Sequence, residues 1–157
     1  NQLDHLDFVF SFIISPAGFD ENMDKAVRKI CTEKENCVFL GSKYDDEKWQ
    51  EIAKHDAIIM PSIYEPFGLV SLEAQVCQRL LICSRVNGLR EIIPENSCIT
   101  CGDNYEGIVS ALMRSYELSA IDIKTYVENG LDNCKKYSWK KTAKQIDGLY
   151  DSLINYY

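Results

Sequence analysis

The chain has 157 residues, of which 46% are hydrophobic and 26% are charged, as expected for one ordinary globular domain with a substantial core. Its net charge of -7 excludes a general nucleic-acid binder, because such proteins present a basic face. No apolar run approaches the roughly 20 residues that a transmembrane segment needs.

The apolar pattern predicts strands and helices in alternation. Strand 7–15 is followed by a helix around 23–30, strand 37–40 by a helix at 45–53, strand 56–60 by a helix at 69–79, strand 80–84 by a short helix at 89–93, and strand 97–101 by helices at 105–116, 122–135 and 139–153. Buried apolar strands alternating with amphipathic helices predict an α/β fold, a Rossmann-like, doubly wound parallel sheet. In such a sheet, ligands bind outside the carboxyl ends of the strands.

Seven cysteines are scattered at positions 31, 37, 77, 83, 98, 101 and 134. An odd number, with several inside apolar runs, indicates reduced thiols and a reducing, cytoplasmic compartment rather than a disulfide framework. Cys98 and Cys101 form a CxxC pair, but a zinc site needs a second such pair, which the sequence lacks. We therefore expect no bound metal and no cofactor.

The loop after strand 56–60 contains a Pro-Phe-Gly corner, Pro66-Phe67-Gly68, at the start of the next helix. Proline suits a first helical turn, and Gly68 lets the backbone come close to a ligand. The N–H groups around Gly68, Leu69 and Val70 point out of a helix start that carries about half a positive charge. This corner is therefore predicted to bind a phosphate or a carboxylate.

Two glutamates, Glu65 and Glu73, flank that predicted anion site. A carboxylate repels phosphate but accepts hydrogen bonds from sugar hydroxyls, as the acidic residue of dinucleotide-binding folds does. A nucleotide-diphospho-sugar, with phosphates between hydroxyl-rich groups, matches this layout. The plainer alternative is that Glu73 stabilises its own helix and Glu65 is a solvated loop residue. An acid and base pair of a glycoside hydrolase is disfavoured, because those carboxylates flank a scissile bond rather than an anion site.

The segment from Pro61 to Ala74 resembles the Glu-x7-Glu signature of retaining glycosyltransferases with the GT-B fold, the class that includes glycogen and sucrose synthases. The resemblance continues through Asn87-Gly88-Leu89-Arg90-Glu91-Ile92-Ile93, Val38-Phe39-Leu40-Gly41 and Tyr137-Ser138-Trp139. It implies that residues 1–157 are a single carboxyl-terminal, nucleotide-sugar-binding domain, one half of a GT-B fold, with 137–157 as its closing helix.

The resemblance also implies a role for each site residue. Glu65, the catalytic-site residue, would hold the transferred sugar together with Phe67, Gly68 and Leu69. Leu69 and Val70 would face the diphosphate, and Glu73 the ribose. Ser42, Lys43 and Tyr44 would lie near the base of a UDP-, ADP- or GDP-linked donor. The family generally needs no metal.

Two departures from the family pattern affect turns. The usual Cys-Gly-x-Pro is replaced by Cys77-Gln78-Arg79-Leu80, and the usual Gly-Gly by Asn87-Gly88, where Asn tolerates the left-handed conformation. The family usually carries an Arg and a Lys, which neutralise the diphosphate, on a strand and loop ahead of the region that corresponds to this chain, and we expect this pair to be missing from residues 1–157. We expect the amino-terminal acceptor domain to be missing as well. We therefore expect little or no sugar transfer from this chain alone. A location at the membrane surface would depend on the missing amino-terminal part.

Other interpretations stay open. A non-catalytic nucleotide-sugar-binding or regulatory module is the alternative function. Arg85 and Arg90 follow strand 80–84, so either could approach the cleft. The last helix, for which Ser138 is a good N-cap, has an apolar stripe that predicts self-association of the chain.

Overall fold

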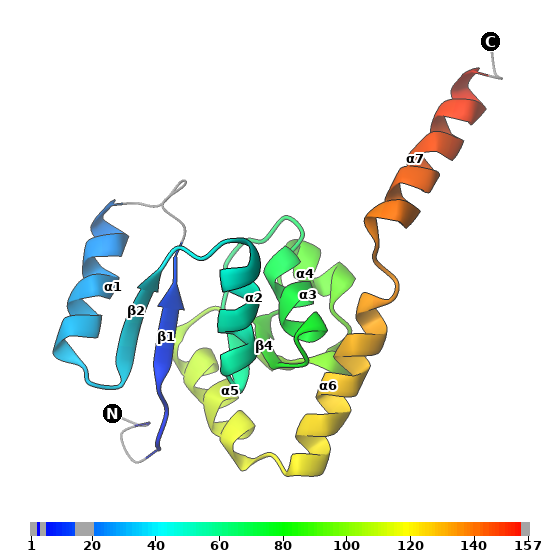
Figure 1. Cartoon of the computed structure of the whole chain (residues 1–157). Helices are drawn as coiled ribbons and strands as arrows, with labels where there is room; N and C mark the ends of the chain where they lie inside the picture. Colours follow the sequence, from blue (N-terminus) through cyan, green and yellow to red (C-terminus); the bar gives the residue numbers. More distant parts are fainter. Residues whose placement is uncertain (1–2, 4–5, 15–20, 155–157) are drawn as a thin grey trace. The chain divides into compact units, whose positions relative to one another are not determined.

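The computed structural model describes residues 3, 6–14 and 21–154, and the chain forms two compact units that divide between His55 and Asp56. In the first unit (Figure 1), strands β1 (Phe10–Ile13) and β2 (Cys37–Gly41) pair in parallel and are connected through helix α1 (Glu21–Glu33). The guanidinium group of Arg28 on α1 lies 3.9 Å from the centre of the Phe39 ring on β2. Helix α2 (Asp45–Lys54) completes this unit.

The second unit contains a parallel sheet of three strands, β3 (Ala57–Met60), β4 (Leu80–Ser84) and β5 (Ile99–Cys101), with β4 in the middle. All five residues of β4 are buried, as expected for a strand covered on both faces. This strand lies within the core, whose buried members are Met60, Leu72, Ala74, Leu81, Cys83, Leu89, Ile92, Ile93 and Cys98.

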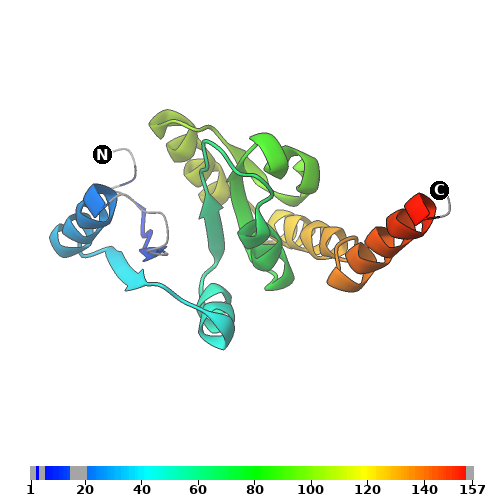
Figure 2. The same ribbon diagram turned by 90° about the horizontal axis from the view of Figure 1, so that it is seen from above.

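The helices of the second unit follow their strands as the sequence predicts. They are α3 (Leu69–Val76), α4 (Asn87–Ile92), the 3-10 turn η1 (Glu95–Ser97), α5 (Tyr105–Glu117), α6 (Ala120–Cys134) and α7 (Trp139–Ile154). Helix α3 packs against β3, β4 and α6, while α5 packs against β5. Figure 2 shows the yellow α6 beside the green α3.

The parallel α/β architecture is confirmed, and several bounds differ from the sequence prediction. The helix predicted at 69–79 ends at Val76, the short helix predicted at 89–93 is α4 (Asn87–Ile92), and the strand predicted at 97–101 begins at Ile99, because Ser97 closes η1. The described strands pair as two sheets, of two and three strands, because apolar patterning shows that a strand is buried but not which strand it pairs with. Strand 7–15 is shorter than predicted and begins at Phe10, and Ser15 lies outside the described residues.

Helix α7 begins where the sequence predicts. The Ser138 hydroxyl oxygen accepts a hydrogen bond of 3.2 Å from the Lys141 amide, which confirms the N-cap. Every residue of α7 is exposed, and residues 155–157 of the predicted closing helix lie outside the described residues. Among the helices of the described part of the chain, none is long and apolar enough to cross a membrane.

Candidate functional site

The loop that follows β3 is tied to the carboxyl end of β4. The hydroxyl of Ser84, the last residue of β4, donates a hydrogen bond of 2.5 Å to the carbonyl oxygen of Ser62. Because β3 and β4 are parallel, this bond lies at the edge of the sheet where doubly wound folds bind ligands. The loop then passes Glu65 and enters α3 at Leu69.

Gly68 occupies the N-cap position of α3 in the left-handed conformation, with φ 98° and ψ 48°. A Cβ atom there would lie 2.4 Å from Cδ2 of Leu89, so both conformation and space require glycine. The amide and hydroxyl of Ser71 donate to the Gly68 carbonyl oxygen, at 3.0 and 2.5 Å, and fix the first turn. The amides of Leu69 and Val70 belong to this turn, where helical N–H groups have no intrahelical acceptor.

The corner before α3 is held by the loop that follows β4. The amide of Gly88 donates a hydrogen bond of 3.0 Å to the carbonyl oxygen of Glu65. A Cβ atom on Gly88 would lie 2.2 Å from the carbonyl oxygen of Pro66 and 2.8 Å from the Phe67 Cα, so the two backbones touch. The neighbouring Asn87 has a φ of 35°, in the left-handed region that asparagine tolerates.

Glu65 and Glu73 lie on either side of the first turn of α3, Glu65 in the loop and Glu73 in the second turn. Both residues are half-buried, so each is partly enclosed while still reaching solvent. The first turn itself contains no acidic residue, so no carboxylate occupies the position where an anion would bind. The structure therefore places Glu65, Phe67, Gly68, Leu69, Val70 and Glu73 around one helix N-terminus.

The residues predicted near the base belong to the first unit, at the carboxyl end of β2. The Ser42 hydroxyl donates a hydrogen bond of 2.9 Å to the Ile14 carbonyl oxygen. The Lys43 ammonium group lies 3.9 Å from a carboxylate oxygen of Glu47, and Tyr44 is 61% exposed at the N-cap position of α2. Of the three side chains, Tyr44 offers the largest free surface to a ligand.

The two arginines that follow β4 brace the backbone around α4. The guanidinium group of Arg85 donates to the Ile93 carbonyl oxygen and lies 3.5 Å from the Glu95 carboxylate. The guanidinium group of Arg90 donates to the Arg85 carbonyl oxygen at 3.1 Å. Both guanidinium groups are thus engaged in hydrogen bonds to backbone carbonyl oxygens. This favours a structural role for the two arginines over the hypothesis that either one approaches the ligand.

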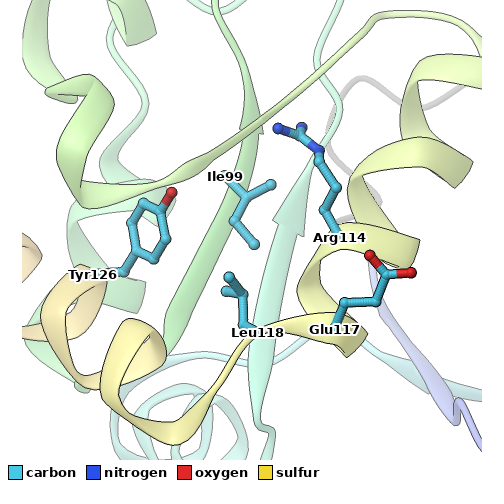
Figure 3. A pocket seen from close by; sticks show the side chains of 5 residues that line it. All are labelled: Ile99, Arg114, Glu117, Leu118 and Tyr126. Carbon is cyan, nitrogen blue, oxygen red and sulfur yellow. The ribbon is translucent and has the colours of Figure 1, made fainter.

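A cavity of about 310 Å³ lies at the amino end of β5 (Figure 3). Ile99 and Leu118 contribute apolar surface, Tyr126 closes one side from α6, and Arg114 with Glu117 comes from α5. Arg114 donates to the Thr100 carbonyl oxygen, so its charge is already engaged. The cavity contains none of the residues predicted to bind the donor.

A second groove, of about 230 Å³, adjoins the Pro66–Gly68 corner. Its lining residues are Phe67, Leu69, Leu72, Val76, Cys134, Tyr137, Ser138, Trp139 and Thr142. The last five of these residues are not among those that the sequence pattern predicts at the ligand site. In the sequence, Tyr137 stands out only as part of the Tyr137-Ser138-Trp139 motif. Its packing against the Pro66–Gly68 corner depends on tertiary structure and could not be predicted from the motif.

All seven cysteines are free thiols. A hydrogen bond with Cys98 and burial raise the pKa of Cys83, and burial raises the pKa of Cys101 and of Cys134. Within residues 3, 6–14 and 21–154, no three His, Cys, Asp or Glu side chains come together in a way that could hold a metal ion. Of the seven thiols, Cys83, Cys98 and Cys101 are buried, and the other four are half-buried.

A parallel α/β sheet with a glycine-capped helix N-terminus at its carboxyl edge defines a Rossmann-like domain of the kind found in GT-B glycosyltransferases. The family described as "Glycosyl transferases group 1" matches residues 17–132, most of the chain. The chain belongs to this family.

Individual proteins agree with this assignment. An uncharacterized glycosyltransferase of Methanocaldococcus jannaschii is 34% identical over 117 residues, which cover 72% of this chain and 30% of that protein. The chain spans about a third of the length of the curated relatives it matches.

Two solved structures share the fold. Sucrose-phosphate synthase from Thermosynechococcus elongatus superposes with a TM-score of 0.77 at 24% identity, covering 95% of this chain and 39% of that one. Anabaena HepE, solved in complex with UDP-glucose, gives a TM-score of 0.77 at 18% identity, covering 92% of this chain and 41% of that one.

Proposed function

We propose that this chain is the donor-binding domain of a retaining glycosyltransferase, which transfers a hexose from a UDP-, ADP- or GDP-linked sugar to an acceptor hydroxyl. The observation that carries the proposal is the N-terminus of α3, where Gly68 is fixed in the left-handed conformation by Leu89 and Ser71. Leu69 and Val70 follow directly as the first two residues of α3, so their amides lie at the positive end of the helix, where N–H groups have no intrahelical acceptor.

The chemistry of transfer assigns a separate task to each part of this segment. The bond between the sugar carbon and the diphosphate oxygen breaks, the acceptor oxygen bonds to that carbon on the same face, and the acceptor proton is released. Negative charge accumulates on the departing diphosphate, which the amides of Leu69 and Val70 and the helix dipole stabilise without reorganising. No metal ion is needed for this neutralisation at the helix end.

The two glutamates act on hydroxyl groups in this scheme. Glu65, with the backbone of Phe67, Gly68 and Leu69, holds hydroxyls of the transferred sugar beside the reacting carbon. Glu73 accepts hydrogen bonds from the ribose, since a half-buried carboxylate is a strong acceptor for neutral hydroxyls. Ser42, Lys43 and Tyr44, at the carboxyl end of β2, contact the base. The UDP-glucose bound to HepE supports a donor of this class.

We also propose a partner domain, a cellular location and self-association for this chain. An acceptor-binding GT-B domain is the expected partner, because the helix end of α3 supplies donor contacts only. We infer a cytoplasmic location, supported by seven free thiols. The apolar side chains along α7 also support self-association of this chain, since all of them are exposed.

Thermal unfolding with UDP, ADP and GDP tests the proposed donor class. A ligand that binds only the folded state stabilises it by roughly 2.7 kcal/mol at a hundred times its dissociation constant. At least one of the three nucleotides is therefore expected to raise the melting temperature, and uridine, adenosine or guanosine without phosphates should raise it less. A melting temperature unmoved by all three diphosphates would contradict the proposal.

A further inference from the structure

The ring of Phe67 meets a second aromatic ring from a distant part of the chain. Its centroid lies 6.2 Å from that of Tyr137, and the two ring planes are at 86°, an edge-to-face arrangement. Phe67 is 42% exposed, so its ring lies partly at the surface of the corner. Tyr137 belongs to the short segment that connects α6 to α7.

Tyr137 is itself fixed to α4. Its hydroxyl donates a hydrogen bond of 3.3 Å to the carbonyl oxygen of Ile92, the last residue of α4. One helical turn earlier, the side-chain amide of Asn133 donates to the same oxygen at 2.9 Å and to the Gln75 side-chain oxygen at 3.2 Å. Asn133 and Gln75 are buried, so this polar cluster joins α6, α4 and α3 rigidly.

The same α4 holds the other side of the Phe67 corner. Gly88, in the first turn of α4, donates to the Glu65 carbonyl oxygen and touches the backbone of Pro66 and Phe67. The corner is therefore held at its backbone by Gly88 and at its side chain by Tyr137. Gly68 and the first amides of α3 follow immediately, so their position depends on both contacts.

We propose that Tyr137 is a positioning residue for the donor-binding corner, acting through Phe67 rather than by touching the ligand. The ring of Tyr137 keeps Phe67 against the end of α6 and thereby holds residues 65–70 in the conformation that presents the Leu69 and Val70 amides. The consequence for donor binding rests on the proposed function. The consequence for the conformation of the corner does not.

Hydrogen exchange of the Gly88 amide measures the corner without any ligand, because this amide donates to Glu65. An edge-to-face pair contributes enough to change an equilibrium roughly two- to tenfold. Tyr137→Leu is expected to accelerate Gly88 exchange by about that factor, and Tyr137→Phe, which keeps the ring, should restore most of the protection. Amides of β4 report global opening and should change less than Gly88.

Tyr126→Leu provides the matched control, because Tyr126 is a half-buried tyrosine on α6 that lines the cavity at β5 (Figure 3). It should alter overall stability without selectively exposing Gly88. Equal exchange at Gly88 in the Tyr137→Leu and Tyr126→Leu chains, at matched overall stability, would overturn the assignment.

Titration with UDP, ADP and GDP adds the functional readout. The Tyr137→Leu chain is expected to bind the preferred nucleotide roughly two- to tenfold more weakly than wild type, and Tyr137→Phe nearly as well as wild type. If the Tyr137→Leu chain binds the nucleotide as tightly as wild type and its Gly88 amide is still protected, the positioning role of Tyr137 is refuted, but the donor-binding function is not. Absence of wild-type binding refutes the donor function, while the exchange result still decides whether Tyr137 holds the corner.

Discussion

The amide of Gly88 donates a hydrogen bond of 3.0 Å to the carbonyl oxygen of Glu65, and this bond joins the two loops at the carboxyl edge of the sheet. The loop after β4 thereby sets the position of the corner that opens α3. Gly88 has no positive φ, so its lack of a side chain matters for space rather than for conformation. Glu65 is held at its backbone, which leaves its carboxylate available for a ligand.

Gly88→Ala is expected to lower the free energy of unfolding by roughly 1–3 kcal/mol, because the new methyl group would overlap the backbone of Pro66 and Phe67. Nucleotide affinity should fall with it as the corner shifts. Urea unfolding measures the first effect. Gly148→Ala on α7 is the matched control, since a Cβ there meets nothing within 4 Å and should leave stability unchanged or raise it. Equal stability of the Gly88→Ala and wild-type chains would show that the close packing is not needed.

Gln78→Gly is expected to stabilise the chain by about 0.5–1 kcal/mol. Gln78 has a φ of 56° at the end of α3, where the Arg79 amide donates to the Ala74 carbonyl oxygen at 3.0 Å, closing a Schellman turn. Glycine, the usual residue of the family pattern at this position, adopts that conformation without steric cost. A lower unfolding midpoint for Gln78→Gly would mean that the glutamine side chain contributes more than its backbone conformation costs.

Replacing each glutamate by glutamine separates the two proposed hydroxyl contacts. Glu73→Gln should weaken a nucleoside diphosphate and its glucose conjugate equally, whereas Glu65→Gln should weaken only the conjugate. Each loss is expected to be about 10- to 100-fold, the value of a hydrogen bond to a charged acceptor. Isothermal calorimetry with both ligands on both variants gives the four affinities. If Glu65→Gln weakens the affinity for the nucleoside diphosphate as much as the affinity for its glucose conjugate, the Glu65 carboxylate does not bind the sugar.

The buried thiols give the stability a defined pH dependence. Burial raises the pKa of Cys101 above its ordinary value of 9.0, so the unfolded chain releases this proton at a lower pH than the folded chain does. Above that pH the unfolded state binds fewer protons, and the free energy of unfolding falls as pH rises. Urea unfolding at neutral and alkaline pH should show a smaller alkaline loss for Cys101→Ala than for wild type. Identical losses would contradict the burial of this thiol.

Helix α7 is expected to make the isolated chain self-associate. Trp139, Leu149 and Leu153 are among its large exposed apolar side chains, and Trp139 is 82% exposed. Sedimentation velocity over a concentration series should show an average mass that rises with concentration. Leu149→Lys together with Leu153→Lys should shift the distribution toward monomer, and a concentration-independent monomer for wild type would refute the expectation.

The sequence predicted those features that depend on local pattern. Strand β4 is a continuous apolar run and is buried at every residue, and Ser138 is an N-cap. Asn87 takes the left-handed conformation that asparagine was expected to tolerate. The corner at Gly68 was likewise predicted from residues that are adjacent in the chain.

Long-range contacts could not be predicted in the same way. The approach of Gly88 to Pro66 and the packing of Tyr137 on Phe67 join segments far apart in the sequence, and no local pattern encodes which backbone will touch which. The pairing of strands into two sheets has the same cause, because apolar periodicity reports burial rather than neighbours.

In the proposed function, the N-terminus of α3 binds the diphosphate of a nucleotide donor. Amide chemical shifts of the isotope-labelled chain, recorded during titration with UDP, ADP or GDP and with the matching nucleoside, test this claim most directly. We expect saturable shifts of the Leu69 and Val70 amides with a diphosphate and much smaller shifts with its nucleoside. Saturable binding that leaves the Leu69 and Val70 amides unmoved would contradict this expectation.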